Sequence, residues 1–243
     1  MKMKKTIEVN GAPFEYEEEC ISYTNNFAIS ENDAREILSL TQTLFKEKGI
    51  SVYIAFGTLL GAIREHALIK GDEDVDVYTD DEEGVLNSLD FFYKRGLRLV
   101  RYVKGRLFSF RMNEKSYIDV YVRCPISGFS IWKLYCCNLD GKPTPKKYFT
   151  TTEPIRFLGL DCQCPGHPEE LVRFWYGKDW RTPVTGHNFF YEVKSHYYWR
   201  KVIDSLKYLI QMVTGWPYWR HLVKKQYKNQ QDSLKEWKKY RHS

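Results

Sequence analysis

The segment from Phe56 to Asp76 constrains this chain more than any other part of its sequence. It reads FGTLLGAIREHALIKGDEDVD, which is a Gly-Thr pair, an apolar run with an arginine, and then carboxylates on alternate residues. Asp74 and Asp76 alternate with Val75 and Val77, and this two-residue period predicts a strand. Alternation places both carboxylates on one face of the strand and both valines on the other, toward a core. The chain must therefore form a sheet with one apolar face and one face that is acidic at this point.

Side-by-side carboxylates need a partner, because they repel by roughly 4 kcal/mol at about 4 Å in an effective dielectric of about 20. A hard cation with oxygen ligands offsets that repulsion. Asp119 repeats the design in a second predicted strand, 117–122, with Ile118 and Val120 turned inward. If the two strands are neighbours, Asp74, Asp76 and Asp119 converge on one or two Mg²⁺ or Mn²⁺ ions, as in metal-assisted transfer of phosphate groups.

The residues before the acidic strand suit a phosphate. The Gly57-Thr58 pair predicts a tight turn, where glycine lets a phosphate approach the backbone and Thr58 adds a hydroxyl. Arg64 offers a planar fork for phosphate oxygens. No Walker pattern is present, because Gly57 and Gly61 are not followed by Gly-Lys-Ser/Thr. Each feature has a plainer alternative: alternate Asp residues form solvated faces, Arg64 pairs with a neighbouring carboxylate, and Gly61 makes a packing contact.

A calcium-binding loop is a competing interpretation of residues 72–83. Asp72, Asp74, Asp76, Tyr78, Asp80 and Glu83 fall at positions 1, 3, 5, 7, 9 and 12 of an EF-hand. Position 6 of that loop requires Gly for its sharp turn, and Val77 stands there. The alternation of valines also favours a strand. The EF-hand is therefore the weaker alternative.

The remaining pattern predicts an α/β (α+β) domain with a mixed sheet flanked by helices. A lead-in with one short strand covers 1–29, and Ser30 caps a helix over 31–48 that Gly49 ends. We expect further strands at 51–56, 74–78, 97–103, 106–112 and 117–122, and helices at 80–94 and from Pro168 to about Trp175. Residues 124–165 read as strands and loops broken by prolines.

Charge divides the chain into a mildly acidic body and a basic tail. The net charge is +6, and residues 194–243 carry twelve Lys and Arg against three Asp and Glu. We expect three parts: a lead-in over 1–29, a catalytic domain over 30–193 and a helical, aromatic-rich extension over 194–243. Residues 196–243 suit peripheral contact with an anionic membrane surface. Packing on the domain is the plainer alternative, and nucleic-acid binding is less favoured.

The sequence has no recognisable signal peptide or membrane span, so a cytoplasmic protein is the expectation. No apolar region follows the N-terminal lysines as a signal peptide requires, and no apolar run approaches about 18 residues. The six cysteines are then expected to stay reduced. Cys162, Cys164 and His167 offer three metal ligands, but their spacing and the lack of a fourth ligand favour ordinary packing cysteines over zinc.

Two motifs carry a family resemblance. FGTLLGAIR at 56–64 and DEDVDV at 72–77 resemble the LicD/fukutin family, whose members carry a polymerase-β-like nucleotidyltransferase fold. The strand at 117–121 also matches, as does a later pattern of Pro165, Leu171, Tyr176-Gly177, Trp180 and Pro183. The resemblance spans about residues 30–185. The chain departs from the pattern at Gly71 and Glu73, and at His66-Ala67.

The resemblance implies a function. Gly57 and Thr58 would hold donor phosphate, Arg64 and Asp72 would belong to the substrate-binding group, and Asp74 and Asp76 would bind Mg²⁺. Asp119 would complete the metal site or deprotonate the acceptor. Family members move phosphocholine or a polyol phosphate from a CDP-alcohol donor to a sugar hydroxyl of a glycan or lipid-linked glycan acceptor. The alternatives are a nucleotidyltransferase that moves NMP, and a non-catalytic calcium-binding protein.

Overall fold

The computed structural model describes residues 2–19, 28–126, 134, 136–140, 142–177 and 179–183. The chain divides into two compact units, 1–124 with 137–181, and 125–136 with 182–243. The first unit holds almost all the described residues. The helical extension expected at 194–243 lies outside the described residues.

Strands and helices alternate irregularly along the first unit. In chain order they are β1 (Lys2–Val9), β2 (Ala12–Glu19), α1 (Glu31–Glu47), β3 (Tyr53–Ile54), α2 (Phe56–Arg64), β4 (Val75–Thr79), α3 (Glu82–Asn87), α4 (Leu89–Lys94), β5 (Arg98–Val103), β6 (Leu107–Arg111), β7 (Tyr117–Val122), β8 (Cys124–Pro125), β9 (Cys136–Leu139), β10 (Lys142–Pro145), a 3₁₀ turn (Lys146–Phe149), β11 (Thr152–Phe157), β12 (Leu160–Pro165) and α6 (Pro168–Tyr176).

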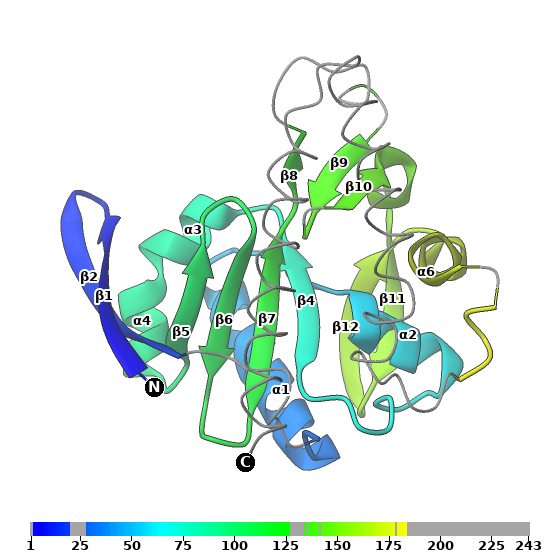
Figure 1. The fold of residues 1–243 in the computed structure, drawn as a ribbon, viewed down its shortest axis with the longest axis horizontal. Helices are drawn as coiled ribbons and strands as arrows, with labels where there is room; N and C mark the ends of the chain where they lie inside the picture. Colours follow the sequence, from blue (N-terminus) through cyan, green and yellow to red (C-terminus); the bar gives the residue numbers. More distant parts are fainter. Residues whose placement is uncertain are drawn as a thin grey trace, which may run out of the picture. The chain divides into compact units, whose positions relative to one another are not determined.

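A five-stranded mixed sheet organises the unit, as the sequence predicted. Its order is β3-β4-β7-β6-β5 (Figure 1). Strands β4 and β7 are parallel and in the centre, with Val75 beside Ile118 and Asp76 beside Asp119. The other pairs are antiparallel. The protein is therefore a mixed α+β protein, and its two acidic strands are direct neighbours.

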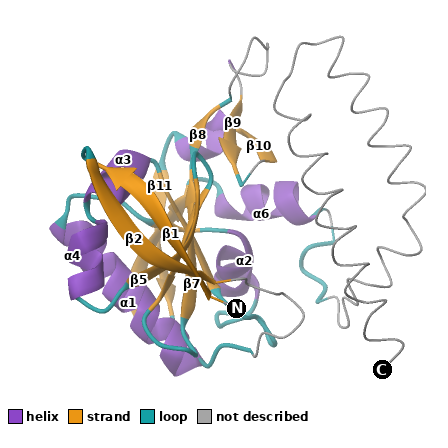
Figure 2. Cartoon of the chain, turned by 60° about the vertical axis from the view of Figure 1, so that its left-hand side comes forward, coloured by secondary structure: helices purple, strands orange, loops and turns teal. Residues whose placement is uncertain are grey.

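Helix α1 covers the apolar face of this sheet. Ser30 caps it by accepting a hydrogen bond from the Asp33 N–H at 3.1 Å, which confirms the predicted start. Phe45 stacks on Phe92 with ring centroids 4.8 Å apart and meets Phe110 edge-on at 6.4 Å. Figure 2 shows α1, α3 and α4 on one side of the strands and α2 and α6 on the other. Burial of this aromatic cluster fixes which face of the sheet is core and leaves the opposite face for the carboxylates.

The N-terminal lead-in differs from the sequence prediction, because residues 2–19 form a complete β-hairpin. Val9 lies opposite Ala12, so Asn10 and Gly11 form a two-residue turn, and both have positive φ, at 53° and 74°. Asn-Gly is the strongest short sequence signal for such a turn. Oppositely charged residues face each other across the hairpin, including Lys4 opposite Glu17.

Three other predicted elements differ in their bounds. The strand expected at 51–56 is only β3, and Gly57-Thr58 lies inside the first turn of α2 instead of forming a separate turn. The helix expected at 80–94 is two helices, α3 and α4, that meet at Ser88. Pro154 does not break its strand, because it pairs with Gln163 in the two-stranded sheet β11-β12. Proline is tolerated there since a two-stranded sheet consists of edge strands.

No helix in the described part of the chain is long and apolar enough to span a membrane.

Helix α2 packs tightly against the segment that follows it. A Cβ atom at Gly61 would lie 2.6 Å from the backbone oxygen of Ala67, so only glycine fits. This supports the packing interpretation of Gly61.

We predict that Gly61→Ala lowers the free energy of unfolding by about 1–3 kcal/mol, because the clash falls on backbone that cannot simply rotate away. Urea denaturation followed by circular dichroism measures the change. Gly57→Ala in the same helix is the matched control. Its Cβ would meet only side-chain oxygens of Asp72 and Asp76, at 3.1 Å, so it should cost less stability. Equal stability of wild type and Gly61→Ala would contradict the packing argument.

Candidate active site

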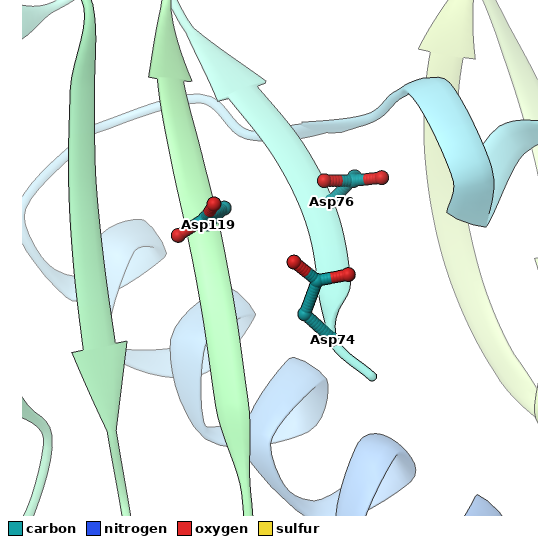
Figure 3. A group of neighbouring side chains, drawn as sticks. All are labelled: Asp74, Asp76 and Asp119. Atoms are coloured by element: carbon teal, nitrogen blue, oxygen red, sulfur yellow. The ribbon is translucent and has the colours of Figure 1, made fainter. Parts of the chain in front are cut away.

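Three carboxylates meet on the face of the sheet opposite α1. Asp74 lies just before β4, Asp76 lies within it, and Asp119 lies beside Asp76 on β7 (Figure 3). One ligand oxygen from each lies within 4.8 Å of the others, and no other such group of three occurs in the residues that the structure describes. Asp119 is 1% exposed and Asp76 is 9% exposed. The predicted convergence of the three carboxylates is therefore confirmed.

The carboxylates belong to a polar row that crosses four strands. Asp76 on β4 lies opposite Asp119 on β7, Asp119 lies opposite Ser109 on β6, and Ser109 lies opposite Arg101 on β5. Arg101 and Ser109 were not among the predicted site residues. Their sequence signal is faint, because a single serine or arginine in an aromatic-rich strand has no local pattern that indicates a site.

Asp119 is held by hydrogen bonds from its neighbours. The Ser109 hydroxyl donates to Asp119 Oδ1 at 2.5 Å, and the Arg101 guanidinium donates to Asp119 Oδ2 at 3.0 Å. The same guanidinium donates to the Tyr117 hydroxyl at 2.9 Å and to Ser109 Oγ at 2.9 Å. The Tyr121 hydroxyl lies 3.5 Å from Asp119 Oδ2. Charge-assisted bonds of this kind offset part of the cost of burying the carboxylate.

Asp76 is fixed by the first turn of α2. Its Oδ2 accepts a hydrogen bond from the Gly57 N–H at 2.9 Å, and its own N–H donates to Thr58 Oγ1 at 2.7 Å. A free N–H at the start of a helix favours a carboxylate. Thr58 is 1% exposed, so in this structure its hydroxyl supports Asp76. The contact of Gly57 and Thr58 with donor phosphate stays a prediction.

A fourth carboxylate, Asp72, lies beside Gly57. A Cβ at Gly57 would stand 3.1 Å from Asp72 Oδ2 and 3.1 Å from Asp76 Oδ2. Glycine at this position therefore lets both carboxylates approach the helix start. The backbone of Asp72 is also tied down, because its carbonyl accepts the Ile29 N–H at 2.9 Å.

Aromatic rings border the acidic cluster. Phe56, the first residue of α2, has a φ of 40°, which is rare for a bulky side chain and costs of the order of 1–3 kcal/mol. Its ring meets Tyr121 edge-on at 4.8 Å and Trp175 at 4.7 Å. Packing of Phe56 between these rings holds the strained backbone in place and directs the next N–H, that of Gly57, at Asp76.

Burial raises the pKa of every carboxyl group in the cluster, and like charge adds to this effect at Asp72, Asp74 and Asp76. The pKa of Asp74 rises to about 8, first through burial and then through the charge of Asp119. Burial raises the pKa of Asp72 to about 6. The pKa of Asp76 is held well above its ordinary value by burial and then by the charge of Asp74. Burial also raises the pKa of Asp119, against the opposing effect of Arg101.

Two tyrosines that were not among the predicted site residues lie in the same negative field. Burial, followed by the charges of Asp76 and Asp119, raises the pKa of Tyr121 well above its usual value. The ring of Tyr176 at the end of α6 is 44% exposed, yet burial of its hydroxyl and the charge of Asp76 raise its pKa as well. A cation at the cluster would relieve this field, and the oxygen-only ligand set suits Mg²⁺ or Mn²⁺.

Arg64 reaches from the end of α2 to two partners. Its Nε donates to Glu65 Oε1 at 2.7 Å, and its Nη1 donates to the Trp180 carbonyl at 3.1 Å. The arginine thereby ties α2 to the segment after α6. Its predicted contact with a substrate phosphate stays a prediction.

Neither of the two alternative metal sites is present: residues 72–83 do not form a calcium loop, and Cys162, Cys164 and His167 do not form a zinc site. Strand β4 occupies 75–79, where an EF-hand would need its turn, so residues 72–83 are not such a loop. Cys162 and Cys164 are buried on β12, where Cys162 accepts a hydrogen bond from Gln42 Nε2 at 3.3 Å. Within the described ranges, these cysteines and His167 do not form a metal-ligand group. Packing is the role that the structure gives both thiols.

The mixed sheet and the carboxylate cluster together define a mixed α+β domain with an acidic site. Residues 49–167 match the family model described as the LicD/FKTN/FKRP nucleotidyltransferase domain. The match supports membership of the LicD/FKTN/FKRP family for this domain, as its motifs indicated. No curated protein matches the chain. Among solved structures, the lincomycin-bound lincosamide antibiotic adenylyltransferase LnuA is similar, with 12% identity, a TM-score of 0.40, and coverage of 69% of this chain and 98% of that one.

We predict that the metal-free protein loses stability as the pH rises from about 5 to about 8. The raised pKa values mean that the folded state binds more protons than the unfolded chain in this range, so the free energy of unfolding falls with pH. The loss should exceed about 1 kcal/mol, since one pKa unit corresponds to about 1.36 kcal/mol. Urea denaturation at several pH values in EDTA measures it.

The matched variant for this test is Asp74→Asn, which removes the group with a pKa of about 8. Its stability should depend less on pH between about 6 and 8. Saturating Mg²⁺ should reverse the trend in the wild type, because the ion binds the ionised carboxylates. A wild-type stability that rises with pH in EDTA would contradict the assignment of raised pKa values.

Proposed function

We propose that this protein is a metal-dependent transferase that moves a phospho-alcohol group from a CDP-activated donor to a sugar hydroxyl. The acceptor would be a cell-surface glycan or a lipid-linked glycan precursor, met in the cytoplasm. The observation that carries the proposal is the approach of three carboxylates to within 4.8 Å inside a domain of the LicD/FKTN/FKRP family.

The residues fit a divalent cation. Asp74, Asp76 and Asp119 supply hard oxygen ligands. Their raised pKa values come first from burial, and at Asp74 and Asp76 also from repulsion, and a cation would offset both effects. Mg²⁺ or Mn²⁺ would neutralise negative charge on the phosphate groups and on the leaving group. The finer details of the polymerase-β-like fold and its ligand subsites belong to this proposal.

The reaction exchanges a phosphoanhydride bond in the donor for a phosphate ester bond in the product. The acceptor oxygen forms a bond with the phosphorus that carries the alcohol, the bond from that phosphorus to CMP breaks, and CMP leaves with its electron pair. The acceptor proton passes to a base. The chain's own task is positioning and charge stabilisation. Gly57, at the start of α2, and Arg64, at its end, are the residues we assign to the donor phosphates.

We predict that Asp74→Asn and Asp76→Asn abolish CMP release from CDP-choline, CDP-ribitol or CDP-glycerol while the protein stays folded. Removing a buried like charge should not unfold the metal-free protein, because it lowers the repulsion in the cluster. Coupled detection of CMP gives the rate, and circular dichroism gives the fold. Asp90→Asn is the control, since the Asp90 side chain is 69% exposed and pairs with Lys94 in α4.

The same assay separates the proposal from the alternative. Pyrophosphate release from a nucleoside triphosphate, with no CMP release from any CDP-alcohol, would show a nucleotidyltransferase that moves NMP. Thermal-shift screening of the same ligands with Mg²⁺ identifies the donor, because a ligand at a hundredfold excess over its Kd stabilises by about 2.7 kcal/mol. Full CMP release by the Asp74→Asn and Asp76→Asn double variant would contradict the metal site.

The basic segment 196–243 lies outside the described residues, and its contact with membranes is a proposal from sequence. We predict that removal of residues 220–243, which hold eight Lys and Arg, reduces co-sedimentation with liposomes containing anionic lipid. Neutral liposomes are the control and should pellet neither form. Equal pelleting of the full chain and the truncated chain with anionic liposomes would eliminate the proposal.

A further inference from the structure

We propose that the Tyr176 hydroxyl donates a hydrogen bond to the phosphate groups of the substrate. This tyrosine was not among the site residues predicted from the sequence. The inference rests on the proposed function, because it adds a residue that binds the same substrate.

Helix α6 brings Tyr176 to the side of the sheet that carries the carboxylates. Tyr176 is the last residue of α6, and α6 lies on the same side of the strands as α2 (Figure 2). The ring of the preceding residue, Trp175, lies 4.7 Å from the ring of Phe56. Phe56 directly precedes Gly57, whose N–H binds Asp76. The end of α6 therefore packs beside the helix start that holds one of the site carboxylates.

The backbone is anchored on both sides of Tyr176. Before it, the Trp175 Nε1 donates a hydrogen bond to Thr144 Oγ1 at 3.3 Å. After it, the Trp180 carbonyl accepts a hydrogen bond from Arg64 Nη1 at 3.1 Å, and the Trp180 side chain is buried. These contacts fix the end of α6 against its surroundings and leave the Tyr176 ring half exposed.

The Tyr176 hydroxyl lies close to charged groups of both signs. Burial, followed by the negative charges of Asp76, Asp72 and Asp74, raises its pKa. The positive charge of Arg64 acts on the same hydroxyl and lowers its pKa in part. The hydroxyl is thus near the carboxylates that would hold the cation and near the arginine that we assign to the donor phosphates. A phosphate held by both would lie within its reach.

This hydroxyl is a donor without a partner in the part of the chain that the structure describes, because no hydrogen bond to it occurs there. Enclosed polar groups in proteins are normally hydrogen-bonded. The raised pKa keeps the phenol protonated near neutral pH, so its O–H is available to donate. Phosphate oxygens are charged acceptors, and hydrogen bonds to charged groups are the stronger kind. The substrate phosphate supplies the partner that the protein does not.

The test measures how tightly the full chain binds pyrophosphate, CDP-choline, CDP-ribitol and CDP-glycerol, each in saturating Mg²⁺, by isothermal titration calorimetry. Tyr176→Phe removes the hydroxyl and keeps the ring. It should weaken the binding of pyrophosphate, and of each CDP-alcohol that the wild type binds, by about 10- to 100-fold. Its free energy of unfolding in urea should equal that of the wild type, because no hydrogen bond within the protein is lost. Tyr93→Phe on α4 is the matched control, since Tyr93 is 59% exposed and α4 lies on the other side of the strands.

Unchanged affinity of a folded Tyr176→Phe for every ligand would overturn the inference, even if Tyr176→Leu, which also removes the ring, binds more weakly. A Tyr176→Phe protein that fails to fold would overturn it too, because the hydroxyl would then have a partner within the protein. Binding of none of the four ligands by the wild type would have the same consequence.

Failure of the proposed function is recognised separately. If Tyr176→Phe weakens pyrophosphate binding but the wild type releases no CMP from any CDP-alcohol, the phosphate contact stands and the transferase assignment fails. If the wild type releases CMP and Tyr176→Phe binds the donor as tightly as the wild type, the transferase assignment stands and the contact fails.

Discussion

Repulsion among buried carboxylates is the constraint on which the rest of this site depends. The parallel pairing of β4 with β7 places Asp76 directly beside Asp119, and Asp74 and Asp72 lie close to the same point. Ionising all of them without compensation would strongly destabilise the folded state. Each surrounding polar contact reduces that cost in part, and a bound cation would complete the compensation.

The compensation comes from both sides of the cluster. On one side, α2 begins against β4. There the Gly57 N–H donates a hydrogen bond to the Asp76 carboxylate, and the Thr58 hydroxyl accepts one from the Asp76 N–H. On the other side, Arg101 and Ser109 hold Asp119. The strained Phe56 backbone and the bulge in β5 are local departures from regular geometry. Both direct a hydrogen-bond donor at a carboxylate, so the strain has a clear structural purpose.

Sequence reasoning found the parts of this site that have a local pattern. Period-two alternation located β4 and β7 and the faces of Asp74, Asp76 and Asp119, because alternation depends only on the strand's own geometry. It could not find Arg101, whose direction depends on a bulge set by pairing with β6. The support role of Thr58 was also out of reach, since its partner is 18 residues away on another element. The hairpin at 2–19 differs from these cases, because its turn has a local signal, Asn10-Gly11, from which the second strand could have been predicted.

The resemblance left two roles open for Asp119, a metal ligand or the base that deprotonates the acceptor, and its environment favours the first. Its side chain is 1% exposed, so a sugar hydroxyl would have to displace neighbouring groups to reach it. Bonds from Arg101 and Ser109 stabilise its ionised form, which makes it a poorer proton acceptor and a better ligand. Asp74 is less enclosed and has a pKa of about 8 in the metal-free protein. In the proposed reaction, the acceptor proton would therefore pass to a base other than Asp119.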